Sequence, residues 1–225
     1  MAHPEDHHTH TLASLYDSIG ARYEKAYANN PAQQKSLEWL LSHLPRAGCK
    51  ILDIGCGTGR PVALALSRPP HHHQVHGIDV SESMLSVARL SAPSASFELT
   101  DVRDFQSDSE SFDAVTSYFA LLVDISQDEI KQIMQNIFTW LRPGGLLVFS
   151  TVPADIEQDA QSWLGRRAIF TSLSEEQYME LLKQLGVVVE YSHVENFMPK
   201  AVEAGICDAA QVTEEPQLFI YARKL

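Results

Sequence analysis

The chain has 225 residues, of which 44% are hydrophobic and 20% charged, enough to bury the core of one large α/β domain. Its formal net charge is −12, and no stretch gathers Lys and Arg, so the basic footprint of a nucleic-acid-binding protein is missing. These features favour a small-molecule substrate over a nucleic-acid partner. We expect a monomer or a weak homodimer.

The sequence carries no signal for export or for a membrane. Its opening ten residues, MAHPEDHHTH, have neither a basic nor an apolar region, and no later apolar run approaches the roughly 20 residues that span a bilayer. We therefore expect a cytoplasmic protein that does not bind membranes. Cys49, Cys56 and Cys207 have spacings that match neither a zinc site nor a disulfide framework. We interpret them as reduced structural thiols and predict no metal.

The amino-terminal region divides into a tail and a cap. Residues 1–11 are rich in histidine and lack periodicity, which predicts a mobile tail more readily than a metal site. Residues 12–225 are expected to form a single domain whose first part, residues 12–46, is a helical cap. Apolar residues recur at helical spacing around Leu15 and again from Leu37 to Leu44, so two helices should precede the first strand.

Short apolar strands then alternate with helical segments. The predicted strands are KILDI, QVHGID, SFELT, DAVTSYF, LLVFST, VVVEYSHV and QLFIYAR, and the predicted helices cover 61–66, 81–90, 127–141 and a segment that ends at Gly186. The helix at 127–141 starts with a capping box from Ser126 to Glu129. This alternation predicts an α/β fold with a doubly wound, mostly parallel, seven-stranded sheet and helices on both faces.

A glycine-rich turn, LDIGCGTGR, joins the first strand to the next helix. Gly55, Gly57 and Gly59 are spaced G-x-G-x-G, and Arg60 stands where a dinucleotide-binding turn needs its third glycine. Asp53 adds a carboxylate beside the turn, which repels phosphate but suits an ammonium or a sulfonium group. The turn therefore favours S-adenosylmethionine as the ligand. The alternative is a turn that only packs a helix on a strand.

Two further aspartates follow the next two strands. Asp79 ends the second strand about 20 positions after Gly59, the spacing at which a carboxylate can accept hydrogen bonds from ribose hydroxyls. Asp101 follows the third strand. One carboxylate at a strand end is usually only solvated, whereas three at the ends of successive strands indicate a shared crevice.

In this order the motifs resemble those of the small-molecule class I S-adenosylmethionine-dependent methyltransferases, from Tyr16 to Thr151. FDAVTSYFAL is similar to the family's fourth-strand motif, and LRPGGLLVFST to its passage from a helix into the fifth strand. The resemblance implies a Rossmann-like methyltransferase fold, with S-adenosylmethionine as cofactor and S-adenosylhomocysteine as product. It implies that the glycine turn holds the methionine part, Asp79 the ribose, and Asp101 with the Val102 backbone the adenine. The implied cofactor residues are Tyr16, Tyr23, Asp53, Gly55, Cys56, Gly57, Gly59, Asp79, Val80, Met84, Asp101, Val102 and Tyr118.

The segment YDSIGARYEKAY, Tyr16 to Tyr27, resembles the part of small family members that covers the cofactor. This places Tyr16 and Tyr23 near the sulfonium, which an aromatic face attracts as it attracts other cations. The alternative is that both tyrosines are core residues of an amphipathic helix.

The predicted reaction is a direct displacement of the methyl group onto the O, N, S or C atom of a small-molecule acceptor, in which the protein aligns the reactants and excludes water. Many family members carry a histidine pair after the fourth strand, but this chain has Leu121, Leu122 and Val123 there, so no catalytic residue is assigned. The missing base leaves open a non-methylating cyclisation or elimination on the same fold. A third hypothesis is that the protein is not an enzyme and binds the cofactor as a regulatory partner of another protein.

The acceptor pocket is expected to form outside the cofactor motifs, from the amino-terminal helices and residues 118–123, 153–170 and 194–215. These segments contain Trp163, Phe170, Phe197 and Met198, which either contact an apolar acceptor or seal the core. Arg166 and Arg167 either pair with an acidic acceptor or are surface charges.

Overall fold

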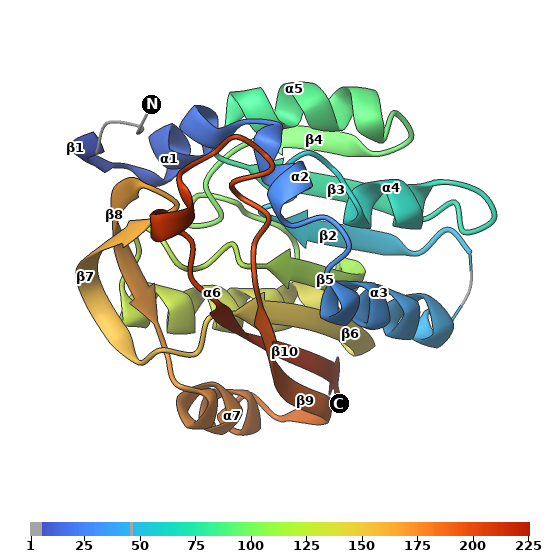
Figure 1. Cartoon of the computed structure of the whole chain (residues 1–225). Coiled ribbons are helices and arrows are strands. Elements are labelled where there is room, and N and C mark those ends of the chain that lie inside the picture. The colour runs from blue at the N-terminus through green and yellow to red at the C-terminus, as the bar shows by residue number, and fades with distance from the viewer. Residues whose placement is uncertain (1–5, 46) are drawn as a thin grey trace.

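A computed structural model of the protein describes residues 6–45 and 47–225 (Figure 1). Its main element is a seven-stranded sheet with the strand order β4-β3-β2-β5-β6-β10-β9. Those strands are β2 (Lys50–Ile54), β3 (Gln74–Asp79), β4 (Ser96–Leu99), β5 (Phe112–Tyr118), β6 (Leu141–Thr151), β9 (Val187–Phe197) and β10 (Glu215–Lys224). The predicted α/β fold is confirmed.

The direction of the strands changes at one place in this sheet. The strands from β4 to β6 are all parallel, and β10 is inserted antiparallel to both β6 and β9. Glu215, the first residue of β10, is paired with Phe197 at the end of β9. The amino end of β10 therefore lies at the edge where the parallel strands have their carboxyl ends.

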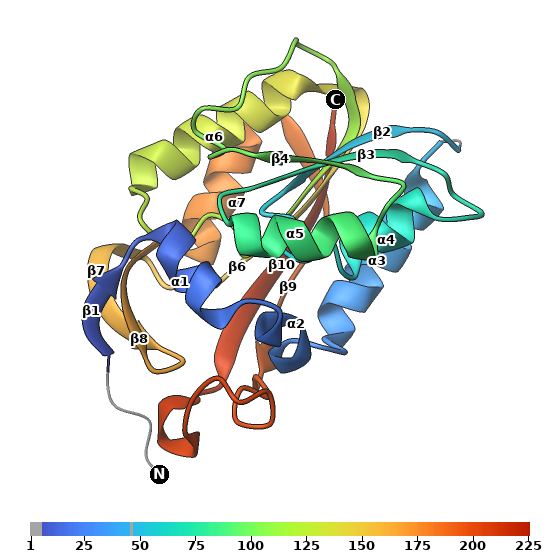
Figure 2. The same cartoon turned by 90° about the horizontal axis from the view of Figure 1, so that it is seen from above.

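Successive residues of each central strand face opposite sides of the sheet, so both faces become apolar. Ile51 packs among residues of α3 (Pro31–His43) and α4 (Val62–Ser67). Its neighbour Leu52 packs among residues of α6 (Gln127–Trp140) and α7 (Glu175–Gln184). Figure 2 shows these two layers of helices, with α5 (Glu82–Ser91) on the side of α3 and α4. None of the helices in the described residues is long and apolar enough to cross a membrane.

Local signals explain where the helices begin. The capping box predicted at Ser126 is present at the start of α6, and Ser81 caps α5 by accepting a hydrogen bond from the Met84 backbone N–H. The amino-terminal region contains three helices before β2 rather than the two predicted, namely α1 (Leu12–Ile19), α2 (Arg22–Ala26) and α3. The extra break lies at Gly20, which has a φ of +57° and ends α1.

A second, three-stranded sheet has the order β1-β8-β7 and lies beside α1 on the side where the parallel strands end (Figure 1). Its strands are β1 (Asp6–His10), β7 (Ile156–Trp163) and β8 (Arg166–Ser172). The sequence reading did not predict this sheet. Residues 1–11 were expected to form a mobile tail, whereas residues 6–10 form a strand that pairs with β8. Residues 1–5 lie outside the described part of the chain.

Candidate active site

The carboxyl ends of β2, β3, β4 and β5 enclose a cavity that we call the strand-end cavity. The glycine turn forms its floor and α1 covers it. The lining residues are Leu12, Tyr16, Tyr23, Ile54, Gly55, Gly57, Ile78, Asp79, Val80, Met84, Thr100, Asp101, Val102, Tyr118, Phe119 and Ala120. Ten of the thirteen residues predicted from sequence are among them.

The backbone of the glycine turn is packed as closely as its sequence suggested. Gly55 has a φ of +66°, and a Cβ at this position would collide with the side chain of Ala120. Gly59 lines none of the cavities; a Cβ there would lie 3.3 Å from the Cβ of Ala88 on α5. Gly59 therefore serves the approach of α5 to the turn, and its predicted contact with a ligand stays a prediction.

The carboxylate of Asp79 is fixed by backbone donors. Its Oδ2 accepts a hydrogen bond from the Gly57 N–H at 2.9 Å, and its Oδ1 accepts one from the Ser81 N–H at 2.9 Å. Burial raises the pKa of Asp79, and these backbone hydrogen bonds oppose the rise. The carboxylate is therefore held rigidly between the turn and α5 with acceptor capacity to spare.

Asp101 is held differently, by an arginine two residues along the chain. The Arg103 guanidinium donates to both oxygens of Asp101, at 3.0 and 2.6 Å. Burial would raise the pKa of Asp101, but the hydrogen bonds from Arg103 lower it. Asp101 therefore reaches the cavity as an ionised carboxylate already paired with a cation.

A second space, the glycine-loop cavity, lies on the other side of the turn and contains Asp53 and Cys56. Asp53 is 2% exposed, and its Oδ1 accepts a hydrogen bond from the Thr116 hydroxyl at 2.7 Å. Its Oδ2 is buried without a hydrogen-bond partner among the described residues. Burial raises the pKa of Asp53 to about 7. A cationic group bound here would satisfy the free oxygen.

The cap is tied to the sheet beside Asp79. Asp17 of α1 accepts hydrogen bonds from the hydroxyls of Ser81, at 2.5 Å, and Ser83, at 2.8 Å. Tyr16, on the same helix, lies edge-on to Tyr23 with ring centroids 5.7 Å apart. These contacts position both tyrosines over the strand-end cavity.

A third space, which we call the aromatic cavity, lies between the cap, the small sheet and the start of β10. Its empty space, part of which is open to solvent, measures about 950 Å³. Its lining residues are Tyr16, Tyr23, Tyr27, Phe119, Leu122, Val123, Val152, Ala154, Ile156, Gln161, Ser162, Trp163, Phe170, Ser172, Thr213, Glu214, Glu215 and Pro216. Tyr16, Tyr23 and Phe119 also line the strand-end cavity, so they separate the two spaces.

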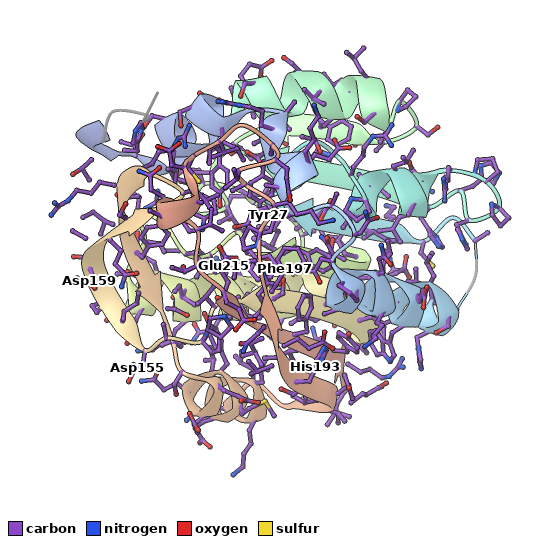
Figure 3. All side chains as sticks on the ribbon, in the orientation of Figure 1. Tyr27, Asp155, Asp159, His193, Phe197 and Glu215 are labelled. Carbon is purple, nitrogen blue, oxygen red and sulfur yellow. The ribbon has the colours of Figure 1, made fainter. Side chains whose placement is uncertain are left out.

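Glu215 projects into this aromatic surrounding. Its Oε1 accepts hydrogen bonds from the Tyr27 hydroxyl at 2.7 Å and from the Trp163 indole N–H at 2.8 Å. Figure 3 shows Glu215 beside Phe197 and Tyr27 in the interior, whereas Asp155 and Asp159 lie at the outer side of β7. Burial raises the pKa of Glu215, against the effect of its three hydrogen-bond donors.

Comparison with known proteins bears on this arrangement. Residues 51–145, which include the glycine turn, Asp79 and Asp101, match the family model of a methyltransferase domain. The chain is 34% identical over 172 residues to a protein of Geobacillus sp. (strain WCH70) that is named as a methyltransferase. The matched region covers 72% of this chain and 65% of that protein. The chain therefore contains a methyltransferase domain of the class I, S-adenosylmethionine-dependent type. It spans 54% to 65% of the length of four curated relatives that it matches.

Solved structures show the same methyltransferase fold. The structure of the [4+2]-cyclase SpnF matches with a TM-score of 0.70 and 20% sequence identity. The match covers 96% of this chain and 97% of that chain. The 1,6-didemethyltoxoflavin-N1-methyltransferase of Burkholderia thailandensis, with bound 1,6-didemethyltoxoflavin and S-adenosylhomocysteine, has a TM-score of 0.63 at 21% identity, covering 95% and 87%. At these identities the likeness concerns the fold alone.

The residues of these cavities fit S-adenosylmethionine, the cofactor of such domains. The Oδ2 of Asp53, which has no hydrogen-bond partner among the described residues, suits the α-ammonium of the methionine part. The Gly55 backbone lines the strand-end cavity. Asp79 has acceptor capacity for the ribose hydroxyls, and Met84, which is 2% exposed, belongs to the apolar part of the same wall. The individual roles of these residues stay predictions.

Several other residues singled out from the sequence have defined places in the structure. Arg166 donates to the Ser18 hydroxyl and to the carbonyls of Leu164 and Ile206, so it joins the cap to the small sheet rather than facing the aromatic cavity. Met198 is 54% exposed and lines none of the cavities described above. The three cysteines are buried. The described residues contain no cluster suited to a metal ion.

Sequence reasoning missed two polar residues of the aromatic cavity, Tyr27 and Glu215. In the sequence, Glu215 is the last residue of the expected acceptor segment 194–215, and Tyr27 is the last residue of the segment predicted to cover the cofactor. Neither was predicted to have a role of its own. The order of residues contains no motif that would have singled them out, because Tyr27, Trp163 and Glu215 come from three distant segments.

Proposed function

We propose that this protein transfers a methyl group from S-adenosylmethionine to a small-molecule acceptor. The observation that carries the proposal is a glycine turn flanked by two carboxylates inside a methyltransferase domain. Asp53 is buried with one oxygen lacking a partner among the described residues, and the half-buried Asp79 is held by backbone donors. The aromatic cavity beside them supports a small, largely apolar acceptor. The net charge of −12 supports an acceptor other than nucleic acid.

When bound, the cofactor supplies an electrophilic methyl group on a sulfonium sulfur. The glycine turn and Asp53 hold its amino-acid part, and Asp79 holds its ribose. Tyr16, Tyr23 and Phe119 separate the two cavities and direct acceptor and donor toward each other. Because the displacement needs alignment more than covalent chemistry, the main work of these residues is orientation and the exclusion of water.

Isothermal titration calorimetry with S-adenosylmethionine and S-adenosylhomocysteine tests the proposal. We expect one site per chain and a loss of about a hundredfold in affinity for Asp79→Ala, because the carboxylate bonds both the ribose and the turn. Asp104→Ala changes an exposed aspartate at the same edge of the sheet and should leave affinity unchanged. Absence of binding by the unaltered protein would contradict the proposed function.

A non-methylating reaction on the same fold remains the alternative, and the likeness to a cyclase structure makes it worth a direct test. Mass spectrometry of the products separates the two. A methyltransferase yields S-adenosylhomocysteine and a product heavier by one methylene. A cyclase yields an isomer of its substrate and leaves the cofactor intact.

A further inference from the structure

The aromatic cavity holds one carboxylate that is built into its wall. Glu215 is half-buried at the start of β10, and the other lining carboxylate, Glu214, is exposed. None of the described lining residues is basic. An acceptor that carries a carboxylate or a phosphate would therefore meet negative charge without a compensating cation.

The hydrogen bonds of Glu215 leave one side of the carboxylate available. Oε1 accepts from both Tyr27 and Trp163, whereas among the described residues Oε2 accepts only the Gln217 amide N–H, at 3.2 Å. Gln217 is itself held, because its Oε1 accepts the Asn30 amide N–H at 2.7 Å. Gln217 and Asn30 are 1% and 4% exposed, so the carboxylate stands on a buried support. The remaining acceptor capacity belongs to Oε2.

The groups that face Glu215 leave it the best proton acceptor of the cavity. Tyr16 of α1, Tyr23 of α2 and Tyr27 after α2 all have pKa values raised by burial, so they stay protonated at neutral pH. Arg167 of β8 and Glu215 both line a groove on the far side of Trp163, and Arg167 does not line the aromatic cavity. Glu214 is solvated. A proton released inside the aromatic cavity therefore has Glu215 as its natural acceptor.

We propose that Glu215 is the acceptor-side base of this enzyme, and that the acceptor is an apolar, non-acidic molecule whose nucleophilic oxygen or nitrogen carries a hydrogen. The inference rests on the proposed function and supplies the base that the sequence did not reveal. The surrounding rings of Tyr16, Tyr23, Tyr27 and Trp163, with centroids 4.6 to 6.4 Å apart, suit a flat or cationic acceptor.

The chemical step balances without any further reactant. The bond between the acceptor atom and the methyl carbon forms as the sulfur–methyl bond breaks, and the electron pair of that bond stays on sulfur. The hydrogen of the acceptor atom passes to Oε2 of Glu215 as a proton. Glu215 then returns the proton to solvent through the open side of the cavity. Since its pKa is raised, its strength as a base is matched to neutral pH better than that of an ordinary glutamate.

The test uses the NMR signal of the Trp163 indole N–H, because this group donates directly to Glu215. With S-adenosylhomocysteine bound, the full-length protein is titrated with three probes of similar size: 4-ethylphenol, phenethylamine and 3-phenylpropionate. We expect the phenol or the amine to shift the Trp163 signal and 3-phenylpropionate to leave it unchanged. In Glu215→Gln, the affinity for the bound probe should fall by about tenfold or more, since a hydrogen bond to a charged group is lost.

Controls separate this inference from the proposed function and from loss of folding. Glu203→Gln removes an exposed carboxylate of the β9–β10 connection that does not line the aromatic cavity, and it should change none of the probe affinities. Glu215→Asp keeps the charge and should restore part of the probe binding. In the unaltered protein, raising the pH through the ionisation of Glu215 should move the Trp163 signal. Tyr27→Phe should shift that transition to higher pH, because the Tyr27 hydrogen bond favours the charged carboxylate.

The proposal is overturned if 3-phenylpropionate binds as tightly as the other two probes, or if neither 4-ethylphenol nor phenethylamine binds. It is also overturned if Glu215→Gln keeps full affinity for the probe that the unaltered protein binds. Any of these results, with S-adenosylhomocysteine still bound, removes the role of Glu215 and leaves the proposed methyl transfer standing. A response to phenethylamine alone selects an amine acceptor, and a response to 4-ethylphenol alone selects a hydroxyl acceptor. Both support the proposal.

Discussion

The strand-end cavity and the aromatic cavity share a wall but are built by different means. The first is formed by backbone at the ends of parallel strands, and Asp79 is held there by peptide N–H groups. The second is formed by side chains from the cap, the small sheet and β10, and Glu215 is held there by Tyr27, Trp163 and Gln217. A site built from backbone changes only when the fold changes, whereas one built from side chains can be altered residue by residue.

This contrast predicts that donor and acceptor binding can be damaged separately. The residues on the shared wall, Tyr16, Tyr23 and Phe119, are the exception, because they contact both spaces. The following substitutions test the contrast, starting with the largest expected effect.

Gly55→Ala should abolish cofactor binding. A Cβ at this position collides with Ala120, and the residue has a φ of +66°, so the turn must move. We expect at least about a hundredfold weaker binding of S-adenosylmethionine by calorimetry, since displacement of a positioning group by about 1 Å has effects of this size. The response of Trp163 to 4-ethylphenol or phenethylamine in the absence of cofactor should persist.

Gly48→Ala is the matched control for this substitution. Gly48 has a φ of +74°, and a Cβ there meets nothing within 4 Å. We expect a loss of about 1 kcal/mol in the free energy of unfolding from backbone strain, with unchanged cofactor affinity. Joint loss of probe and cofactor binding in Gly55→Ala would show that the two cavities do not behave independently.

Asp53→Asn should remove a pH dependence that belongs to the donor side alone. The pKa of Asp53 is about 7 in the empty protein, so binding the cofactor ammonium below that pH requires the loss of a proton. Affinity should therefore rise between pH 5.5 and 7.0, by up to about tenfold per pH unit, while the ammonium stays charged. In Asp53→Asn the affinity should be lower and the slope reduced to the part that Asp79 contributes. A full slope in this variant would refute the role of Asp53.

Although Asp53→Asn should weaken cofactor binding, it should increase the stability of the cofactor-free protein at neutral pH. Because the folded-state pKa of Asp53 is raised, its protonated form contributes stability that is fully present below the unfolded value of 3.8 and is lost as the pH rises through about 7. Relative to the unaltered protein, empty Asp53→Asn should therefore gain about 1 to 3 kcal/mol between pH 5 and pH 8. Urea denaturation at the two pH values measures this difference.

Asp17→Ala should have the smallest effect, on the rate at which the cofactor leaves. It removes the acceptor of two serine hydroxyls that hold α1 over the strand-end cavity. Since such exposed contacts contribute about 1 kcal/mol or less, dissociation of S-adenosylhomocysteine should be about two- to fivefold faster in stopped-flow measurements. Glu38→Ala, an exposed acidic residue on α3, is the control and should leave the rate unchanged.

The parts of the molecule that could be predicted from sequence are those whose signals are local. The strands of the large sheet are short apolar runs, and the glycine turn with Asp53 is a contiguous motif. Asp79 and Asp101 follow from strand ends, because parallel strands end at one edge of the sheet. Backbone geometry thus converts neighbouring residues into a shared cavity without reference to distant side chains.

The parts that could not be predicted depend on contacts between distant segments. The segment IEQDAQSW is polar and largely exposed, with no alternation that would indicate strand β7; its pairing with β8 forms the strand. Glu215 is one of many acidic residues until β10 pairs with β9 and brings it to Tyr27 and Trp163. Its function comes from these neighbours and not from its place in a motif.

The antiparallel insertion of β10 has a consequence for how such an enzyme can diversify. Glu215 is anchored in a strand by its pairing with Phe197, while residues 198–214 before it form the connection from β9. Those residues can be lengthened, shortened or exchanged to reshape the space around an acceptor without shifting the carboxylate or residues 51–145. The fold thus combines a variable connection, residues 198–214, with a proton acceptor whose position is fixed by the sheet.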